Sequence, residues 1–307
     1  MTMVVGYAPD ERGRTALHLT SLLTRSTDDE IVVCSVVPSP WLPGMARVDA
    51  EYRATLEKEA DAALEHAKAA MPSDVNATYV RHSARSAPAG LLEVARNREA
   101  RLIILGSSSA GVFGHVVLGS TTERLLHGSP VAVALAPRGF RCGPDTTITR
   151  VTAAYDDSEN ANTLVVAAST LAAEVGAGLR IASFAVWSQP AYTTRLGTDS
   201  EDDVLQSWTS SIEQAAALAL GRVADLASAP PKLETVIGRG PDWGAAIDEV
   251  EWHDGDVLIV GSSSIGPLAQ VFLGTRASKI VRYAPVPVMV LPRRRAELLA
   301  SEANVRA

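Results

Sequence analysis

The chain has 307 residues, and its 47% hydrophobic and 21% charged residues are typical of a globular protein of about two domains, not of a disordered or fibrous chain. Its formal net charge of −7 argues against nucleic-acid binding through a basic surface, and its two cysteines are too few for a disulfide framework or a cysteine-rich zinc site. The chain opens without a basic and apolar leader, and its most apolar stretch, residues 164–179, is short and carries a glutamate. We therefore expect a cytoplasmic protein without membrane contacts.

Short β-branched runs alternate with longer amphipathic patterns along the whole chain, and these predict strands and helices respectively. In the first half, the expected strands are residues 3–7, 31–37, 77–82, 101–105 and 131–136, and the expected helices are 13–23, 48–71, 88–98 and 120–127. In the second half, the expected strands are 151–155, 179–186, 233–237, 256–260 and 286–291, and the expected helices are 160–175, 204–226, 242–250 and 275–283.

The second half of the chain repeats the first. Residues 102–138 align with residues 257–293 without a gap, at a constant offset of 155 positions, and the segments near the two starts align at an offset of 148. We therefore predict two copies of one domain, at residues 1–139 and 147–295, joined by a segment rich in glycine, proline and polar residues. Strand–helix alternation in each copy predicts an α/β fold with a parallel sheet, helices on both faces and a ligand site beyond the carboxyl ends of the strands.

A glycine-containing loop follows the fourth predicted strand of each copy, from Gly106 to Ser120 and from Gly261 to Thr275. The glycine that ends the strand allows a sharp turn and a close approach by a ligand. The next helix starts at the end of the loop, where free N–H groups and the helix dipole attract anions. We expect Ser120 to form a capping box with Glu123, and Thr275 to act as a simple cap. The loops favour phosphate binding, and the alternative is an ordinary strand–turn–helix connection without a ligand.

Other phosphate-binding and catalytic motifs fit these loops less well. A Walker A loop has lysine directly after its second glycine, whereas Val112 and Pro267 stand at that position in the two copies. The last glycine of a nucleophile elbow is replaced by Ala110 or Ile265, and no Gly-x-Gly-x-x-Gly follows the first strand of either copy. The six histidines are scattered without metal-ligand spacing. We therefore expect neither a catalytic residue set nor a metal site.

The doubled glycine pattern resembles the universal stress protein family in its tandem form, over nearly the whole chain. Each copy has a loop of the form Gly-x2-Gly-x9-Gly-Ser/Thr after its fourth strand, with serine at the middle glycine. The resemblance implies two doubly wound, five-stranded parallel domains with strand order 3-2-1-4-5, related by a pseudo-twofold axis and paired through their last strands. It also implies an ATP site. There the glycines and the terminal hydroxyl hold phosphates and ribose, an aspartate after the first strand holds the nucleoside, and backbone after the second strand contacts adenine.

These binding positions transfer unevenly to the two copies. Asp156 can take the aspartate role in the second copy, whereas in the first copy Ala8 offers no carboxylate and Pro9 no N–H. Both copies have serine at the middle glycine, Ser109 and Ser264. We expect the second copy to bind ATP and the first to bind it weakly or not at all. The candidate nucleotide-binding residues are Asp156, Ala185, Gly261, Ser263, Ser264, Gly274, Thr275 and Arg276 in the second copy, and Gly106, Ser109, Gly119 and Ser120 in the first.

The resemblance implies a nucleotide-responsive stress-response regulator or interaction protein. Its ligands would be an adenine nucleotide, accompanied by magnesium, and an unidentified protein partner, and tandem chains would pair as a homodimer. Because no general base, activated nucleophile or metal-ligand set stands out, we expect at most slow ATP hydrolysis. Two alternatives stay open. One is a nucleotide-free interaction or scaffold module with vestigial sites, and the other is an enzyme that cleaves ATP to adenylate a substrate.

Several other residues are given structural places by the sequence. His115 in the first glycine loop would either touch a phosphate or face solvent, and the latter is the simpler interpretation. We expect Trp208 and Trp243 in the core or an interface, Cys142 as an exposed thiol, and residues 293–307 as a frayed, charged tail.

Overall fold

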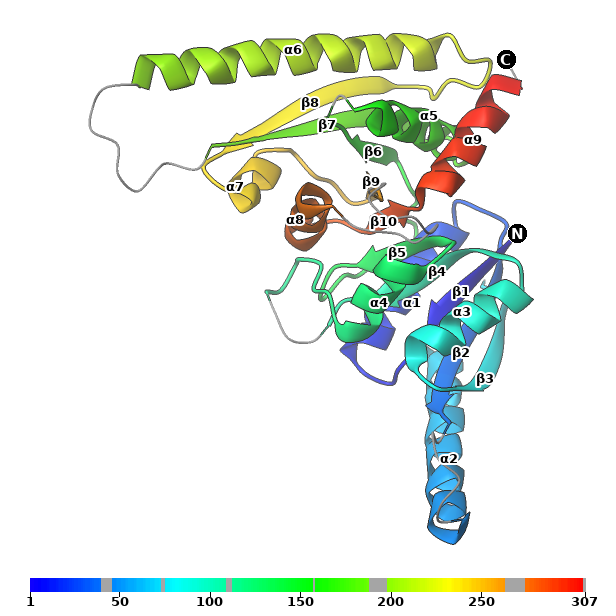
Figure 1. Cartoon of the computed structure of the whole chain (residues 1–307). Coiled ribbons are helices and arrows are strands. Elements are labelled where there is room, and N and C mark those ends of the chain that lie inside the picture. The colour runs from blue at the N-terminus through cyan, green and yellow to red at the C-terminus, as the bar shows by residue number, and fades with distance from the viewer. Residues whose placement is uncertain are drawn as a thin grey trace.

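The computed structural model describes residues 1–39, 46–72, 75–108, 112–156, 158–187, 198–262 and 274–305, which form two α/β halves joined along one sheet (Figure 1). The first half contains β1 (Thr2–Gly6), α1 (Glu11–Thr24), β2 (Glu30–Pro38), α2 (Ala46–Ala70), β3 (Ala77–Ala84), α3 (Ala87–Asn97), β4 (Ala100–Gly106), α4 (Ser120–Gly128) and β5 (Ala132–Ala136). The second contains β6 (Arg150–Ala154), α5 (Glu159–Glu174), β7 (Gly178–Val186), α6 (Thr198–Ala224), β8 (Leu233–Gly240), α7 (Trp243–Asp248), β9 (Asp256–Gly261), α8 (Thr275–Tyr283), β10 (Val288–Leu291) and α9 (Arg293–Val305).

The ten strands form one sheet in the order β3-β2-β1-β4-β5-β10-β9-β6-β7-β8. The predicted order 3-2-1-4-5 is confirmed in the first half, and the second half repeats it as β8-β7-β6-β9-β10. Strands within each half pair in parallel, whereas β5 and β10 pair antiparallel, with Ala134 opposite Met289. The last strands therefore join the two halves as expected, and the antiparallel contact makes the sheet continuous.

Two apolar layers cover the two faces of this sheet, and each runs through both halves. One layer lies under α1, α2, α5, α6 and α9, and the other lies under α3, α4 and α8. The strands read as near-continuous apolar runs because both of their faces are buried, as the all-buried pattern of β5 illustrates. None of the described helices is long and apolar enough to cross a bilayer.

The end of the chain corrects one prediction, because residues 293–305 form helix α9 instead of a frayed tail. Its Ala296, Leu299 and Ala303 are buried, and α9 packs along α5 (Figure 1). The hydroxyl of Thr170 on α5 donates a hydrogen bond to the Leu299 carbonyl at 3.4 Å. These three apolar residues are three and four positions apart, which is the spacing of one helix face. The many charged residues of the segment had suggested a solvated tail instead.

Contacts between the halves also account for two residues that the sequence had assigned to solvent. The His115 Nδ1 atom lies 3.0 Å from the carbonyl oxygen of Tyr283 on α8, so His115 is part of the contact between the halves. Cys142 is partly buried, and Arg25 on α1 donates hydrogen bonds to its sulfur at 3.2 Å and to the Gly143 carbonyl at 2.6 Å. Burial raises the pKa of the Cys142 thiol, which makes it less reactive than a free thiol.

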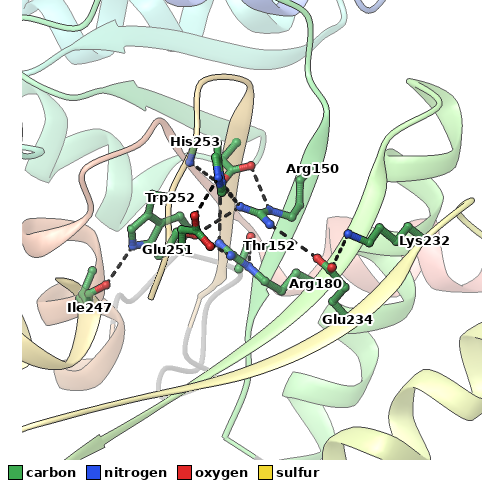
Figure 2. A network of polar contacts seen from close by, with 10 residues as sticks. Arg150, Thr152, Arg180, Lys232, Glu234, Ile247, Glu251, Trp252 and His253 are labelled. Carbon is green, nitrogen blue, oxygen red and sulfur yellow. Dashed lines mark hydrogen bonds and ion pairs between the residues drawn. The ribbon is translucent and has the colours of Figure 1, made fainter. Parts of the chain in front are cut away.

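A buried ion network fixes the amino-terminal ends of the strands in the second half (Figure 2). Arg150 on β6 donates from Nε and Nη2 to the two carboxylate oxygens of Asp256 on β9, at 3.0 and 2.6 Å. Arg180 on β7 lies with its Nη2 atom 3.7 Å from the same carboxylate and its guanidinium 4.6 Å from the centre of the Trp252 ring. Burial and the neighbouring Arg150 lower the pKa of Arg180 to about 10. Asp256 therefore compensates two guanidinium groups at once.

Candidate functional site

Each half has a cavity beyond the carboxyl ends of its first and fourth strands. The cavity of the second half has a volume of about 480 Å³, and that of the first half about 380 Å³. Parallel α/β sheets bind ligands at this edge. The second cavity brings together five predicted residues, which are Asp156, Gly261, Gly274, Thr275 and Arg276. The first brings together Gly106, Gly119 and Ser120. Ser109, Ser263 and Ser264 lie outside the described residues.

The helices that open onto the cavities begin differently from the prediction. Gly119 occupies the N-cap position of α4, and Gly274 occupies that of α8, so neither helix has a side-chain cap. The expected capping box of Ser120 and Glu123 is therefore wrong, and Thr275 lies in the first turn of α8 instead of capping it. A glycine at the N-cap leaves the first-turn N–H groups without a side-chain acceptor. The positive end of α8 thus borders the second cavity without a competing cap.

The glycines that end β4 and β9 have different neighbours. A Cβ atom on Gly106 would lie 2.0 Å from the carbonyl oxygen of Arg12 on α1, so the close approach of α1 alone requires glycine there. A Cβ atom on Gly261 would lie 3.5 Å from the Leu164 side chain, an ordinary van der Waals contact. Packing against α1 therefore explains why residue 106 is glycine without any ligand. Packing does not require glycine at position 261 in the same way.

Asp156 and Ser158 follow β6 and occupy the entrance of the second cavity. Asp156 is exposed, and its Oδ1 accepts a hydrogen bond from the Ser158 N–H at 3.2 Å. The Ser158 hydroxyl in turn accepts from the Ala161 N–H at 3.1 Å and caps α5. Asp156 lines the cavity, and a carboxylate has lone pairs enough to accept hydrogen bonds from ligand hydroxyls as well.

The corresponding loop of the first half uses its only carboxylate for the fold. The Asp10 side chain caps α1 by accepting hydrogen bonds from the N–H groups of Arg12 and Gly13 at 3.0 and 3.2 Å. The Arg12 Nε also donates to Asp10 at 2.7 Å. Burial raises the pKa of Asp10, but these hydrogen bonds outweigh it and the pKa is lowered. Ala8 lines the cavity without a polar side chain, so the first site offers no free carboxylate in this loop.

Aromatic side chains contribute to the lining of the second cavity. Phe184 at the end of β7, Trp208 on α6 and Trp243 at the start of α7 line it. Ala185 is 4% exposed and lies outside the lining, whereas its neighbour Phe184 lines the cavity. The Tyr7 N–H donates to the Cys34 carbonyl at 2.9 Å, and the Tyr155 N–H donates to the Ala182 carbonyl at the same distance. These equivalent hydrogen bonds align the second strands of the two halves, so Phe184 is the counterpart of Val36. A shift of one residue in a strand turns a side chain to the opposite face.

The two tryptophans line the cavity as well. Trp243 is half-buried and packs against one of the apolar layers, in line with the expected core or interface position, whereas Trp208 is 38% exposed. The sequence did not indicate that the two tryptophans share a cavity, because they are far apart along the chain. The packing of α6 and α7 around β7 brings both of them to it. A lining that combines aromatic side chains with the start of a helix suits an amphipathic ligand.

The charged groups of the two cavities also differ. Arg276, Arg293, Asp156 and Glu297 line the second cavity. The first has Arg12, which is paired with Asp10, and Glu59. Among the described residues, the chain has no cluster of three or more histidines, cysteines or carboxylates that could bind a metal by itself. The second cavity therefore has the larger set of positive groups for an anion.

Comparison with known sequences matches the Universal stress protein family to residues 1–137 and 147–292. Universal stress proteins from Mycobacterium tuberculosis and Mycobacterium bovis are each 37% identical to the chain over 296 residues, which cover 95% of this chain and 100% of each relative. A universal stress protein structure from Archaeoglobus fulgidus matches at 19% identity with a TM-score of 0.58, covering 95% of this chain and 98% of its own. A protein of unknown function from Pseudomonas aeruginosa matches at 14% identity with a TM-score of 0.55, covering 99% and 97%. At these identities the structural matches bear on the fold alone.

Proposed function

Because the chain belongs to the universal stress protein family, in its tandem two-domain form, we propose that its second half binds an adenine nucleotide and that the protein acts as a nucleotide-responsive regulator or interaction protein in the stress response. The observation that carries this proposal is the uncapped start of α8 in one cavity with Gly261, Thr275 and Arg276. Its volume of about 480 Å³ lies within the range of roughly 300–1,000 Å³ usual for small-molecule sites.

The residues that line the cavity offer partners for each part of a nucleotide. At the start of α8, backbone N–H groups, the Thr275 hydroxyl and the Arg276 guanidinium supply donors and positive charge for phosphates. Asp156 is placed to accept hydrogen bonds from ribose hydroxyls. Phe184 and Trp243 offer apolar faces against which a purine ring can pack. Magnesium would be carried mainly by the phosphates, since the described residues form no metal cluster of their own.

Nucleotide binding would alter the surface at the carboxyl edge of the second half, where the protein partner would be recognised. The nucleotide can shift the equilibrium between two conformations of this edge only as far as its affinities for the two conformations differ. The first half, whose Gly106 and Asp10 already have packing and capping roles, acts in this proposal as a scaffold. These same two observations favour the second candidate, a nucleotide-free interaction module, if the second cavity also proves empty of nucleotide.

Calorimetric titration of ATP into the purified full chain tests the proposal with two matched variants. Thr275→Ala removes the hydroxyl at the start of α8, and Ser120→Ala removes its counterpart on α4. We expect one ATP per chain and a loss of roughly tenfold in affinity for Thr275→Ala, the usual effect of one hydrogen bond to a charged group. Ser120→Ala should leave the affinity unchanged.

Asp156→Ala supplies the second arm of the same titration. We expect it to weaken the binding of ATP and of adenosine alike, because its carboxylate would contact the part they share. Absence of any binding heat from the unaltered chain would leave the nucleotide-free module as the better interpretation. Equal losses for Thr275→Ala and Ser120→Ala would contradict the assignment of the site to the second half.

A further inference from the structure

Helix α9 forms part of the wall of the second cavity. Arg293, Ala296 and Glu297 of α9 line this cavity together with residues of α5 and α8. In Figure 1, α9 starts directly after β10 and runs beside α5. The first half has no such helix at the corresponding place, since the chain after β5 leads through residues 137–149 to β6. The wall contributed by α9 is therefore a feature of the second cavity alone.

The start of α9 is attached to the glycine loop through Ser262. The Ser262 hydroxyl accepts a hydrogen bond from the Arg293 N–H at 3.1 Å, and the Ser262 N–H donates to the Leu291 carbonyl at 3.0 Å. The counterpart in the first half, Ser107, accepts instead from the Val117 N–H of its own loop, at 3.0 Å. Among the described residues, Ser107 thus bonds within its own loop and to the Ala136 carbonyl at the end of β5, whereas Ser262 connects its loop to α9.

Packing along α5 fixes α9 relative to the entrance of the cavity. Ala296 and Leu299 are each 5% exposed, and both belong to the apolar layer that also contains Ala161 and Leu164 of α5. Leu164 and Ala161 line the cavity as well. A displacement of α9 would therefore change the wall of the cavity in two ways, through its hydrogen bond to Ser262 and through its packing on α5.

The charged residues of α9 form an ion pair at the cavity wall. The Arg293 Nε donates to the Glu297 Oε1 at 2.7 Å, and the two side chains are 49% and 48% exposed. Such an exposed pair is weak, because both groups are well solvated and flexible. A phosphate in the cavity would attract the guanidinium and repel the carboxylate, and an arginine–phosphate contact can use two parallel hydrogen bonds.

We infer that Arg293 is a phosphate-binding residue of the second site, which exchanges Glu297 for the phosphates when nucleotide binds, and that α9 thereby completes the site. This inference rests on the proposed nucleotide binding. It assigns opposite effects to the two partners of the pair. Arg293 strengthens the binding of phosphates, and Glu297 weakens it by competing for the guanidinium and by its own charge.

Titration of the full-length chain with ATP and with adenosine tests this inference. Arg293→Ala should weaken ATP binding by roughly tenfold, the effect of a hydrogen bond to a charged group, and should leave adenosine binding unchanged. Glu297→Gln should tighten ATP binding by about two- to threefold, because a nearby like charge is removed. Arg294→Ala is the matched control, since Arg294 is exposed on the same helix and outside the cavity lining. It should have no effect on either ligand.

The outcomes separate this inference from the proposal on which it rests. If the unaltered chain binds ATP while Arg293→Ala behaves like Arg294→Ala, the role of α9 is overturned and nucleotide binding stands. If the unaltered chain binds no ATP, both are overturned. Should Arg293→Ala lose its fold, as judged by circular dichroism, Glu297→Gln decides alone, because unchanged affinity for ATP would contradict the exchange of partners and tighter binding would support it.

Discussion

The two halves share a strand order but differ in the residues that follow the first strand. Asp156 stands where the first half has Ala8, and Ser158 caps α5 where Asp10 caps α1. In the first half, Asp10 neutralises Arg12, which lines the cavity. In the second, the cap is an uncharged hydroxyl and the carboxylate of Asp156 stands apart from it. The comparison teaches that the duplicated copies kept the packing of the strands while the charges at one edge diverged.

The glycines after β4 and β9 show the same divergence in steric terms. Gly106 lies against the backbone of α1, where any side chain would collide, and Gly261 has ordinary space toward Leu164. An identical residue at equivalent positions therefore has different reasons for being there. A repeated motif consequently predicts a shared fold more securely than a shared ligand.

The buried ion pairs at the amino-terminal edge of the sheet give the largest expected effect. Asp256→Ala should lower the free energy of unfolding by about 3–5 kcal/mol, because it removes the carboxylate nearest to two largely buried guanidinium groups and leaves Arg150 with the more distant Glu234, at 3.6 Å. Its counterpart in the first half, Arg101, has two acidic partners, the buried Asp29 and the more exposed Glu174. Glu174→Ala should therefore cost less than about 1 kcal/mol. Urea unfolding of both variants checks this, and equal costs would show that burial does not set the difference.

Substitution of the two strand-ending glycines should give the next largest effect. Gly106→Ala should destabilise the chain by about 3 kcal/mol, because its Cβ would overlap the α1 backbone. Gly261→Ala should change the free energy of unfolding by less than about 1 kcal/mol and weaken ATP binding, because its Cβ would lie at the wall of the cavity. Thermal unfolding and ATP titration of both variants provide the measurement. If both variants unfold alike, the steric distinction between the halves is wrong.

The helix caps should give the smallest effect and distinguish the halves by pH. The pKa of Asp10 is lowered in the folded chain, so its charge stabilises the fold above the unfolded-state pKa, and this stability is lost as the pH falls through the folded pKa. Asp10→Asn should therefore differ from the unaltered chain by less than about 1 kcal/mol at pH 6, since the group is partly exposed, and by almost nothing near pH 2.

Ser158→Ala is the control for this pH dependence, because the hydroxyl that caps α5 does not titrate. Its cost of about 1 kcal/mol should be similar at both pH values. Urea unfolding at pH 6 and near pH 2 gives the comparison, and a cost of Asp10→Asn that is independent of pH would contradict the role assigned to its charge.

The sequence was sufficient for the fold because several local signals agreed. Apolar runs of strand length, amphipathic helices and an ungapped repeat all predicted the same α/β architecture, and the strand order followed from the family resemblance. Helix α9 was missed because its arginines suggested a solvated tail, although Ala296 and Leu299 already had helical spacing. Local pattern is therefore a good guide to elements and a weaker guide to which of them pack together.

The site was predicted only where it depends on the glycine loop and the first strand. The predicted residues Asp156 and Thr275 line the cavity, whereas the predicted Ala185 is buried and its neighbour Phe184 lines the cavity instead. Trp208 and Arg293 reach the cavity through tertiary packing of α6 and α9, which no spacing along the chain encodes.

The β5–β10 ladder has a consequence for how the two cavities stay together. It joins two strands of one polypeptide, so their association depends on the length of the intervening chain and not on how dilute the protein is. Subunits of a dimer assembled from separate chains can dissociate and re-form with identical partners, which averages out any inequality between them. Within this chain two copies with differently lined cavities are permanently coupled in a one-to-one ratio, so their inequality is inherited by every molecule.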